Sequence, residues 1–296
     1  MDKVKKIDIH AHATAFPESV PVSARTGKRL LSGGELLKMY DKLGIEVGVL
    51  QALVSPEAAL TPITSESCKQ IADAYPDRFA WFCGVDPRAL SNFPGSDLTY
   101  LIQHYKSLGA KGLGEINANM YMDDPMIDNL FFHCAQCDMP VMIHLGRKVG
   151  GGYGLVDEPG LPKLERMLQK YPTLKIFGHS IPFWNELFST DSQERQQEGR
   201  IPELMRKYEN LYCDLSAGSG SSAMMRDPEY TAAFMSEFQD RIFYGCDIVS
   251  DEDTHPFVFR DFLDSMLENG KITLDVYNKI CRYNAEKILR WKGNEV

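Results

Sequence analysis

The chain has 296 residues, of which 44% are hydrophobic and 25% are charged, and this ordinary globular composition excludes a disordered or fibrous protein. Forty-one acidic against thirty-two basic residues give a net charge of −9, so without a run of Lys or Arg we expect no nucleic-acid partner. The longest strongly apolar stretch, 47–54, is far too short to span a bilayer, and residues 1–6 lack the apolar core of a signal peptide. Seven scattered cysteines are typical of reduced thiols. We therefore expect a cytoplasmic protein without a membrane partner.

Short apolar runs alternate with longer amphipathic stretches along the whole chain. The eight runs, each predicted to form a strand, are 6–12, 47–53, 79–85, 111–116, 140–145, 174–179, 211–215 and 242–247. The stretches predicted to form helices are 34–43, 65–75, 96–108, 124–137, 161–171, 201–208, 257–268 and 274–289. The strands begin about 30–40 residues apart, which is the length that one βα unit needs. Several helices end at Gly or near Pro, which are the usual stop signals.

Repeated strand–helix units without a Pro/Gly/Ser-rich linker predict a fold of the α/β class, a closed parallel (β/α)8 TIM barrel. We expect one domain over residues 1–296. A doubly wound open sheet is the alternative. It usually has fewer strands, and its phosphate-binding glycine fingerprint is absent from this sequence.

The ends of the predicted strands carry a set of histidines and acids. Catalytic groups of a (β/α)8 barrel lie at the carboxyl ends of its strands. The first run ends in Asp8-Ile9-His10-Ala11-His12, and because strand side chains alternate, Asp8, His10 and His12 share the barrel interior. The fourth, fifth, sixth and eighth runs end at or near Glu115, His144, His179 and Asp247. A lone histidine is more often a core residue, but imidazoles converging with carboxylates form the ligand set of zinc or a similar divalent ion.

On these residues the chain resembles the amidohydrolase superfamily, and within it the branch of small-acid hydrolases and decarboxylases, along almost its whole length. The series that carries the resemblance is His10-x-His12, Glu115, His144, Gly178-His179 and Asp247. The resemblance implies a metal-dependent, amidohydrolase-like barrel domain. Its divalent metal, expected to be Zn2+ with Mn2+ as the alternative, would be held by the His-x-His pair, the strand-five histidine and the strand-eight aspartate.

The resemblance also sets the number of metals. In binuclear members a strand-four acid or modified lysine bridges to a second metal, which the strand-five and strand-six histidines complete. Glu115 occupies the bridging position, which favours two metals, although many relatives place another residue there. In mononuclear members the strand-six histidine, here His179, is free to hydrogen-bond the substrate or shuttle a proton.

The expected chemistry follows from these ligands. A divalent ion lowers the pKa of bound water from about 15.7 to about 7, so hydroxide is available at neutral pH. Asp247 can accept the proton of the attacking hydroxide and pass it to the leaving group. The metal, or His179 as a donor, would stabilise the developing oxyanion. We therefore predict Asp247 and His179 as catalytic residues. Asp8 either orients an imidazole or, because it lies deeper than His10, has only a structural role.

Weaker signals surround the predicted site. Arg147 follows the fifth strand and could grip a substrate carboxylate, unless it is an ordinary surface residue. His255 follows the eighth strand closely enough to be a candidate substrate-binding residue. The glycine-rich stretch 150–154 is interpreted as a flexible lid, and the Gly/Ser run 218–222 as a loop at the barrel mouth.

The leading functional prediction is hydrolysis of a C–N or C–O bond in a small, carboxylated molecule such as an amide, lactone or ester. Non-oxidative decarboxylation of a small carboxylic acid is the alternative, because the resembling branch includes both activities. A metal-dependent nuclease is opposed by the acidic charge balance. A non-enzymatic metabolite-binding barrel would require the loss of a ligand, and none is missing from the series. Barrels of this kind often pair, so a homo-oligomer is a candidate assembly.

Overall fold

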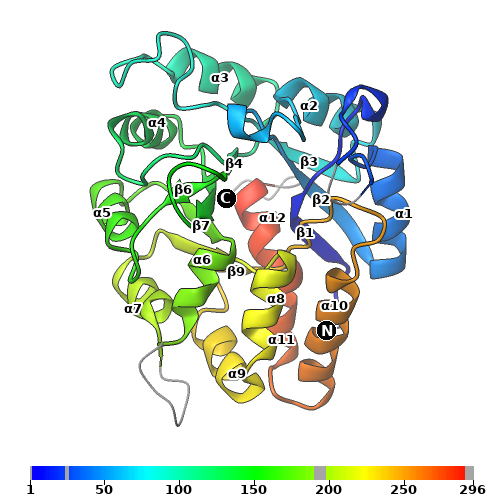
Figure 1. The fold of residues 1–296 in the computed structure, drawn as a ribbon. Coiled ribbons are helices and arrows are strands. Elements are labelled where there is room, and N and C mark those ends of the chain that lie inside the picture. The colour runs from blue at the N-terminus through cyan, green and yellow to red at the C-terminus, as the bar shows by residue number, and fades with distance from the viewer. Residues whose placement is uncertain (1, 24–26, 190–197, 291–296) are drawn as a thin grey trace. The chain divides into compact units, whose positions relative to one another are not determined.

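The computed structural model describes residues 2–23, 27–189 and 198–290 (Figure 1). The chain divides into two compact units. The first comprises Met1–Gln51, Glu66–Trp81 and Cys213–Val296, and the second comprises Ala52–Ser65 and Phe82–Tyr212. The prediction of one domain over residues 1–296 stays a prediction.

Parallel strands from both ends of the chain make up the sheet structure of the first unit. Strands β1 (Lys6–Ala11), β2 (Ile45–Gln51) and β3 (Phe79–Phe82, with Phe82 outside this unit) lie in that order. Every residue of β1 is buried, as expected of a parallel strand that is covered on both faces. The last two residues of β8 (Leu211–Asp214) pair in parallel with β9 (Ile242–Phe243).

The segment that follows β9 runs along β1. The amide of Ile9 donates to the carbonyl of Tyr244 at 3.0 Å, and the amide of Asp247 donates to the carbonyl of His10 at 2.8 Å. A parallel bridge also joins Ala11 to Ile248. These bonds bring Asp247 beside the end of β1, although 236 positions separate Asp247 from Ala11 in sequence.

Helices and helical turns complete the first unit. They are a 3-10 turn (Pro17–Ser19), α1 (Gly33–Leu43), α2 (Ser65–Ala74, with Ser65 outside this unit), α8 (Ala217–Met225), α9 (Pro228–Glu237), α10 (His255–Glu268), α11 (Leu274–Asn278), a π-helical turn (Lys279–Tyr283) and α12 (Asn284–Leu289). Helix α1 shows how local sequence sets the bounds. Ser32 and Glu35 form a capping box at its start, and Gly44 ends it with a left-handed φ of 69°.

The second unit is built on three neighbouring parallel strands. These are β4 (Leu113–Ile116), β5 (Val141–Gly146) and β7 (Ile176–His179), in that order, with the short β6 (Leu155–Val156) paired to β5. The register of β5 and β7 places His144 directly opposite His179. Side chains of directly paired residues point to the same face of a sheet, so the two imidazoles are neighbours.

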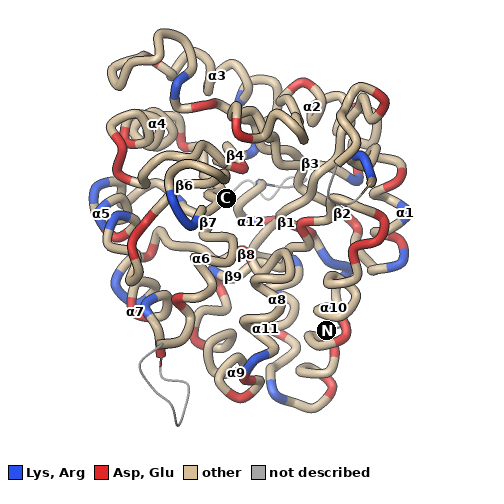
Figure 2. Tube along the Cα trace, viewed as in Figure 1, with Lys and Arg blue, Asp and Glu red and all other residues tan. Residues whose placement is uncertain are grey.

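The helices of the second unit are α3 (Thr99–Ser107), α4 (Pro125–Gln136), α5 (Pro162–Lys170), the short α6 (Ile181–Trp184) and α7 (Arg200–Lys207), with 3-10 turns at Pro56–Ala58 and Asn185–Leu187. Asp124 caps α4 by accepting from the amide of Met126, and Pro125 occupies the first turn. Figure 2 shows Lys and Arg among Asp and Glu on α5 and α7, where Glu165 binds both Arg200 and Lys207. Charges of both signs therefore alternate on this surface.

Each of the eight predicted strands corresponds to a strand in the described residues, but two details of the prediction are wrong. The run predicted as strand 242–247 forms a strand only at Ile242–Phe243, because residues 244–247 bond to β1 as an irregular segment. The stretch 218–222 lies within α8 and is not a loop. Gly220 is buried there, and a Cβ at this position would lie 2.4 Å from the carbonyl oxygen of Leu215, so close packing requires glycine at this position. Among the helices that the structure describes, none combines the length and apolarity that crossing a bilayer would require.

Candidate metal-binding clusters

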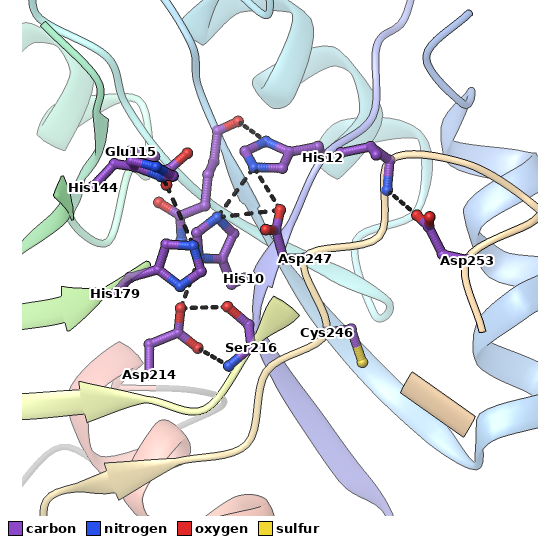
Figure 3. Close-up of polar contacts among 12 residues, drawn as sticks. His10, His12, Glu115, His144, His179, Asp214, Ser216, Cys246, Asp247 and Asp253 are labelled. Atoms are coloured by element: carbon purple, nitrogen blue, oxygen red, sulfur yellow. Dashed lines mark hydrogen bonds and ion pairs between the residues drawn. The ribbon is translucent and has the colours of Figure 1, made fainter. Parts of the chain in front are cut away.

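Three predicted ligands meet in the first unit. His10 is in β1, His12 follows it on the same face, and Asp247 follows β9. The Nε2 atoms of the two histidines lie 3.1 Å apart, and Asp247 Oδ1 lies 3.2 Å from Nε2 of His12 and 3.8 Å from Nε2 of His10. Figure 3 shows the two rings and the carboxylate directed at one another. The imidazoles are buried, whereas the Asp247 side chain is 22% exposed.

Each ring has a hydrogen-bond acceptor on the side away from the cluster, next to its Nδ1 atom. Nδ1 of His10 lies 2.7 Å from Oδ2 of Asp214, and Nδ1 of His12 lies 3.3 Å from the backbone carbonyl of Gln51. A carboxylate and a carbonyl can only accept, so both Nδ1 atoms donate. In a neutral imidazole the other ring nitrogen, Nε2, then carries a lone pair, and the two Nε2 atoms and Asp247 Oδ1 lie 3.1–3.8 Å from one another, where a cation could bind all three.

This arrangement fits a divalent cation. Imidazole nitrogen and carboxylate oxygen are common zinc ligands, and tetrahedral ligands at about 2.0–2.1 Å from the metal lie about 3.3 Å from one another. The three observed separations, 3.1, 3.2 and 3.8 Å, are close to that spacing. A cation would also remove the repulsion between the three electron-rich atoms.

Asp214 is itself held in place, and sequence reasoning missed it. The backbone amide of Ser216 donates to Asp214 Oδ1 at 3.0 Å, and the Ser216 hydroxyl donates to Oδ2 at 2.6 Å (Figure 3). Asp214 lies at the end of the predicted strand 211–215, so the rule that selected the other strand-end residues would also have found this carboxylate. Gly245 allows the close approach, because a Cβ there would lie 2.3 Å from Asp214 Oδ1.

Asp8 has the structural one of the two roles predicted for it. Its Oδ1 accepts from the backbone amides of His10 at 3.0 Å and Cys246 at 2.8 Å, and its Oδ2 accepts from the Tyr40 hydroxyl at 2.7 Å. Burial raises the pKa of Asp8 to about 7, although the hydrogen bond from Tyr40 opposes the shift. Asp8 thus joins the backbone segments that carry His10 and Asp247, while Asp214 contacts the imidazole.

The remaining predicted ligands form a cluster in the second unit. Glu115 from β4 lies between two imidazoles: its Oε1 is 2.5 Å from Nδ1 of His144 and 3.7 Å from Nε2 of His179. Candidate ligand atoms of all three residues lie within 4.8 Å of one another. Glu115 and His179 are buried, and the ring of the half-exposed Tyr153 packs 4.5 Å from the His144 ring, centroid to centroid. Two imidazoles and a carboxylate can hold a cation or transfer a proton between them.

The two predicted substrate-binding residues lie close to the ligand-bearing segments in sequence. Arg147 is exposed immediately after β5, three positions beyond His144. His255 is the first residue of α10, and its Nε2 lies 2.6 Å from the backbone carbonyl of Cys246, the neighbour of Asp247. The stretch predicted as a lid, 150–154, leads into β6. There Gly154 packs against His144, because a Cβ at Gly154 would lie 2.8 Å from Cδ2 of that ring.

A comparison with protein-family models agrees with the resemblance that the ligand series carries. A family model described as "Amidohydrolase" matches residues 7–291. No curated protein sequence matches the chain.

Solved structures agree with the predicted fold. An uncharacterized Tim-barrel protein from Bordetella bronchiseptica is 16% identical, with a TM-score of 0.64 over 97% of this chain and 99% of that chain. A probable 2-pyrone-4,6-dicarboxylic acid hydrolase from Acinetobacter baumannii with citric acid bound is 11% identical (TM-score 0.60; 97% and 100%). A 5-carboxyvanillate decarboxylase from Novosphingobium aromaticivorans, complexed with manganese and 4-hydroxy-3-methoxy-5-nitrobenzoic acid, is 18% identical (TM-score 0.62; 96% of each chain). These likenesses confirm the α/β barrel class.

Proposed function

The chain belongs to the amidohydrolase family, and on this premise we propose that it is a metal-dependent hydrolase that cleaves a C–N or C–O bond of a small, carboxylated molecule. The observation that carries the proposal is the convergence of the two Nε2 lone pairs of His10 and His12 with the Asp247 carboxylate. Zn2+ is the proposed metal and Mn2+ the alternative. A divalent cation at this cluster would supply Lewis-acid chemistry, polarising an oxygen of the substrate or of water.

Asp247 is the proposed general base. Its carboxylate is next to the lone pairs of His10 and His12, yet it keeps 22% exposure, so it can take a proton from water and release it to the leaving group. Its backbone is anchored to His10 by a 2.8 Å hydrogen bond, which keeps the carboxylate in place during the transfer. Asp214 and Gln51 hold the imidazoles in the tautomer that can bind metal.

In the second unit, Glu115, His144 and His179 are proposed to hold a second ion. If no second ion binds, Glu115 and His179 are proposed to store and donate a proton. Arg147 would bind a substrate carboxylate, since it is exposed and always charged. His255 would contact the substrate from the start of α10, with its ring oriented by the Cys246 carbonyl.

The second candidate function is non-oxidative decarboxylation. It is favoured by the likeness to the manganese-containing neighbour, which is a 5-carboxyvanillate decarboxylase. In that case the same residues would hold the metal and the carboxylate, and a protonated side chain such as His179 would deliver a proton to carbon.

Turnover in isotopically labelled water separates the two functions. The metal-loaded protein would be assayed against small amides, lactones, esters and aromatic acids, with Asp247→Asn as the matched variant. Hydrolysis places labelled oxygen in the product, whereas decarboxylation releases carbon dioxide and leaves solvent hydrogen on carbon. If wild-type protein supplied with Zn2+ or Mn2+ retains no metal in elemental analysis, the proposal is wrong. Two ions per chain would support a metal at Glu115, and one would leave that residue in an acid–base role.

A further inference from the structure

Two asparagines follow β4, and their surroundings differ sharply. Asn117 is buried, with 2% of its surface exposed, and its side-chain oxygen Oδ1 has no hydrogen-bond partner among the described residues. Asn119 uses its whole side chain: Nδ2 donates to the carbonyls of Lys148 at 3.0 Å and Gly154 at 3.1 Å, and Oδ1 accepts from Gly150. The second asparagine ties the glycine-rich stretch to β4, while the first leaves a buried acceptor unused.

An unpartnered buried acceptor is costly to the free protein and therefore calls for an explanation. A buried polar atom that loses its water without gaining a partner destabilises the folded state, so most such atoms are paired. An apolar side chain of similar size would avoid this cost, yet an amide is present at position 117. A ligand that donates a hydrogen bond would satisfy it.

The backbone links Asn117 to the Glu115 cluster. Asn117 is the residue that follows β4, two positions after Glu115. Its backbone carbonyl accepts from the amide of Gly154 at 2.8 Å, and Gly154 packs against the His144 ring. The asparagine is thus connected through one glycine to a ring that contacts Glu115.

We propose that Asn117 is a specificity-determining residue whose carboxamide oxygen accepts a hydrogen bond from an N–H or O–H group of the substrate. This inference rests on the proposed function, because it assumes that a small carboxylated substrate binds at the Glu115 cluster. It adds a requirement to that function: the substrate presents a donor, as a secondary amide or a hydroxylated acid does, and analogues without the donor leave a buried acceptor unpaired.

The free protein provides the first arm of the test. Asn117→Leu removes the unpaired oxygen, so the thermal midpoint of unfolding should stay unchanged or rise. Asn119→Ala is the matched control and loses three side-chain hydrogen bonds, so its midpoint should fall by about 2–4 °C or more. Asn117→Ala accompanies Asn117→Leu in case the larger side chain does not fit. If both Asn117 variants lose as much stability as Asn119→Ala, the amide is satisfied within the fold and the proposal is overturned.

Ligand binding provides the second arm and needs no turnover. Two matched pairs of probes, N-acetylglycine with N-acetylsarcosine and 2-hydroxybenzoate with 2-methoxybenzoate, differ only by methylation of an N–H or O–H donor. Calorimetry on the zinc-supplied full chain should show about tenfold or tighter binding of the donor-bearing member of at least one pair. If wild type distinguishes the members of only one probe pair, that pair identifies the donor as N–H or O–H. The Asn117→Leu variant should bind the two probes of that pair with equal affinity.

Three outcomes would overturn the proposal. Wild type could bind the two members of each pair equally, or it could bind neither donor-bearing probe. The Asn117→Leu variant could also discriminate between the probes as well as wild type does. A different outcome would separate the two proposals. If binding discrimination depends on Asn117 but no substrate is turned over in labelled water, the role of Asn117 is supported and the proposed hydrolase function is rejected.

Discussion

Replacing Asp214 by alanine removes the carboxylate that orients His10. The carboxylate is fully buried, lies 2.7 Å from Nδ1 of His10, and is fixed by two hydrogen bonds from Ser216. Without it, the proton of His10 is free to move to Nε2, which is the nitrogen that faces His12 and Asp247. A protonated Nε2 cannot bind a metal, so the variant should bind the cation more weakly.

The expected loss is about 10- to 100-fold in metal affinity, the usual cost of removing the hydrogen-bond partner of a ligating histidine. This corresponds to about 1.4–2.7 kcal/mol. The short separation and complete burial of the pair place the expected effect at the upper end of that range. Ser216→Ala should cost less, because it removes the 2.6 Å hydroxyl contact but keeps the backbone amide on Oδ1.

The assay is competition between the protein and a chromophoric zinc chelator, with thermal unfolding of the metal-free proteins measured in parallel. Asp157→Ala is the control for a loss of structure alone. Asp157 accepts from the amides of Lys163 and Leu164 at the start of α5, in the other unit. This control should lower stability and leave zinc affinity unchanged. Zinc binding by Asp214→Ala as tight as that of wild type would refute the role of Asp214 in selecting the tautomer.

Three further predictions address the site and the fold. His12→Ala should lose most of the bound metal and all activity, because it removes one of three converging donors, and elemental analysis that found full metal occupancy would contradict the assignment. Asp247→Asn should keep its fold by circular dichroism but lose turnover by several orders of magnitude, because an amide cannot accept the proton; near-normal turnover would exclude Asp247 as the base. Arg88→Met should destabilise the protein by about 1–3 kcal/mol, since Arg88 binds both Glu57 and Asp86. Burial, the largest single effect, raises the pKa of these two acids. The hydrogen bonds and charge of Arg88, with further hydrogen bonds from Asn119 to Glu57 and from Ser55 to Asp86, together outweigh it and lower the pKa of both. The stabilisation is therefore complete above the unfolded-state pKa values of about 4 and declines at lower pH, so a gap between wild type and variant in urea that did not narrow below about pH 4 would oppose this account.

The identity of the ligand-bearing residues could be predicted from local rules. Strand side chains alternate, so the sequence alone placed His10 and His12 on one face of β1. Catalytic groups of a parallel barrel lie at the carboxyl ends of its strands, and this rule predicted Glu115, His144 and His179. Short-range periodicity and capping depend on neighbours within a few residues. The eight strands and the bounds of most predicted helices could therefore also be predicted from the sequence.

Long-range contacts decided the rest. The partner of His10 is Asp214, 204 positions away, and its carboxylate is held by Ser216 and approached by Gly245. No local pattern specifies such a contact, since it depends on which backbone segments meet. Irregular bonding of residues 244–247 to β1 likewise ended β9 early, and the Gly/Ser run 218–222, whose composition favours a loop, lies within α8. Asn117 and Asn119 show the limit most clearly. They are the same residue two positions apart, and only the folded chain leaves one amide oxygen buried without a partner while the other binds a loop.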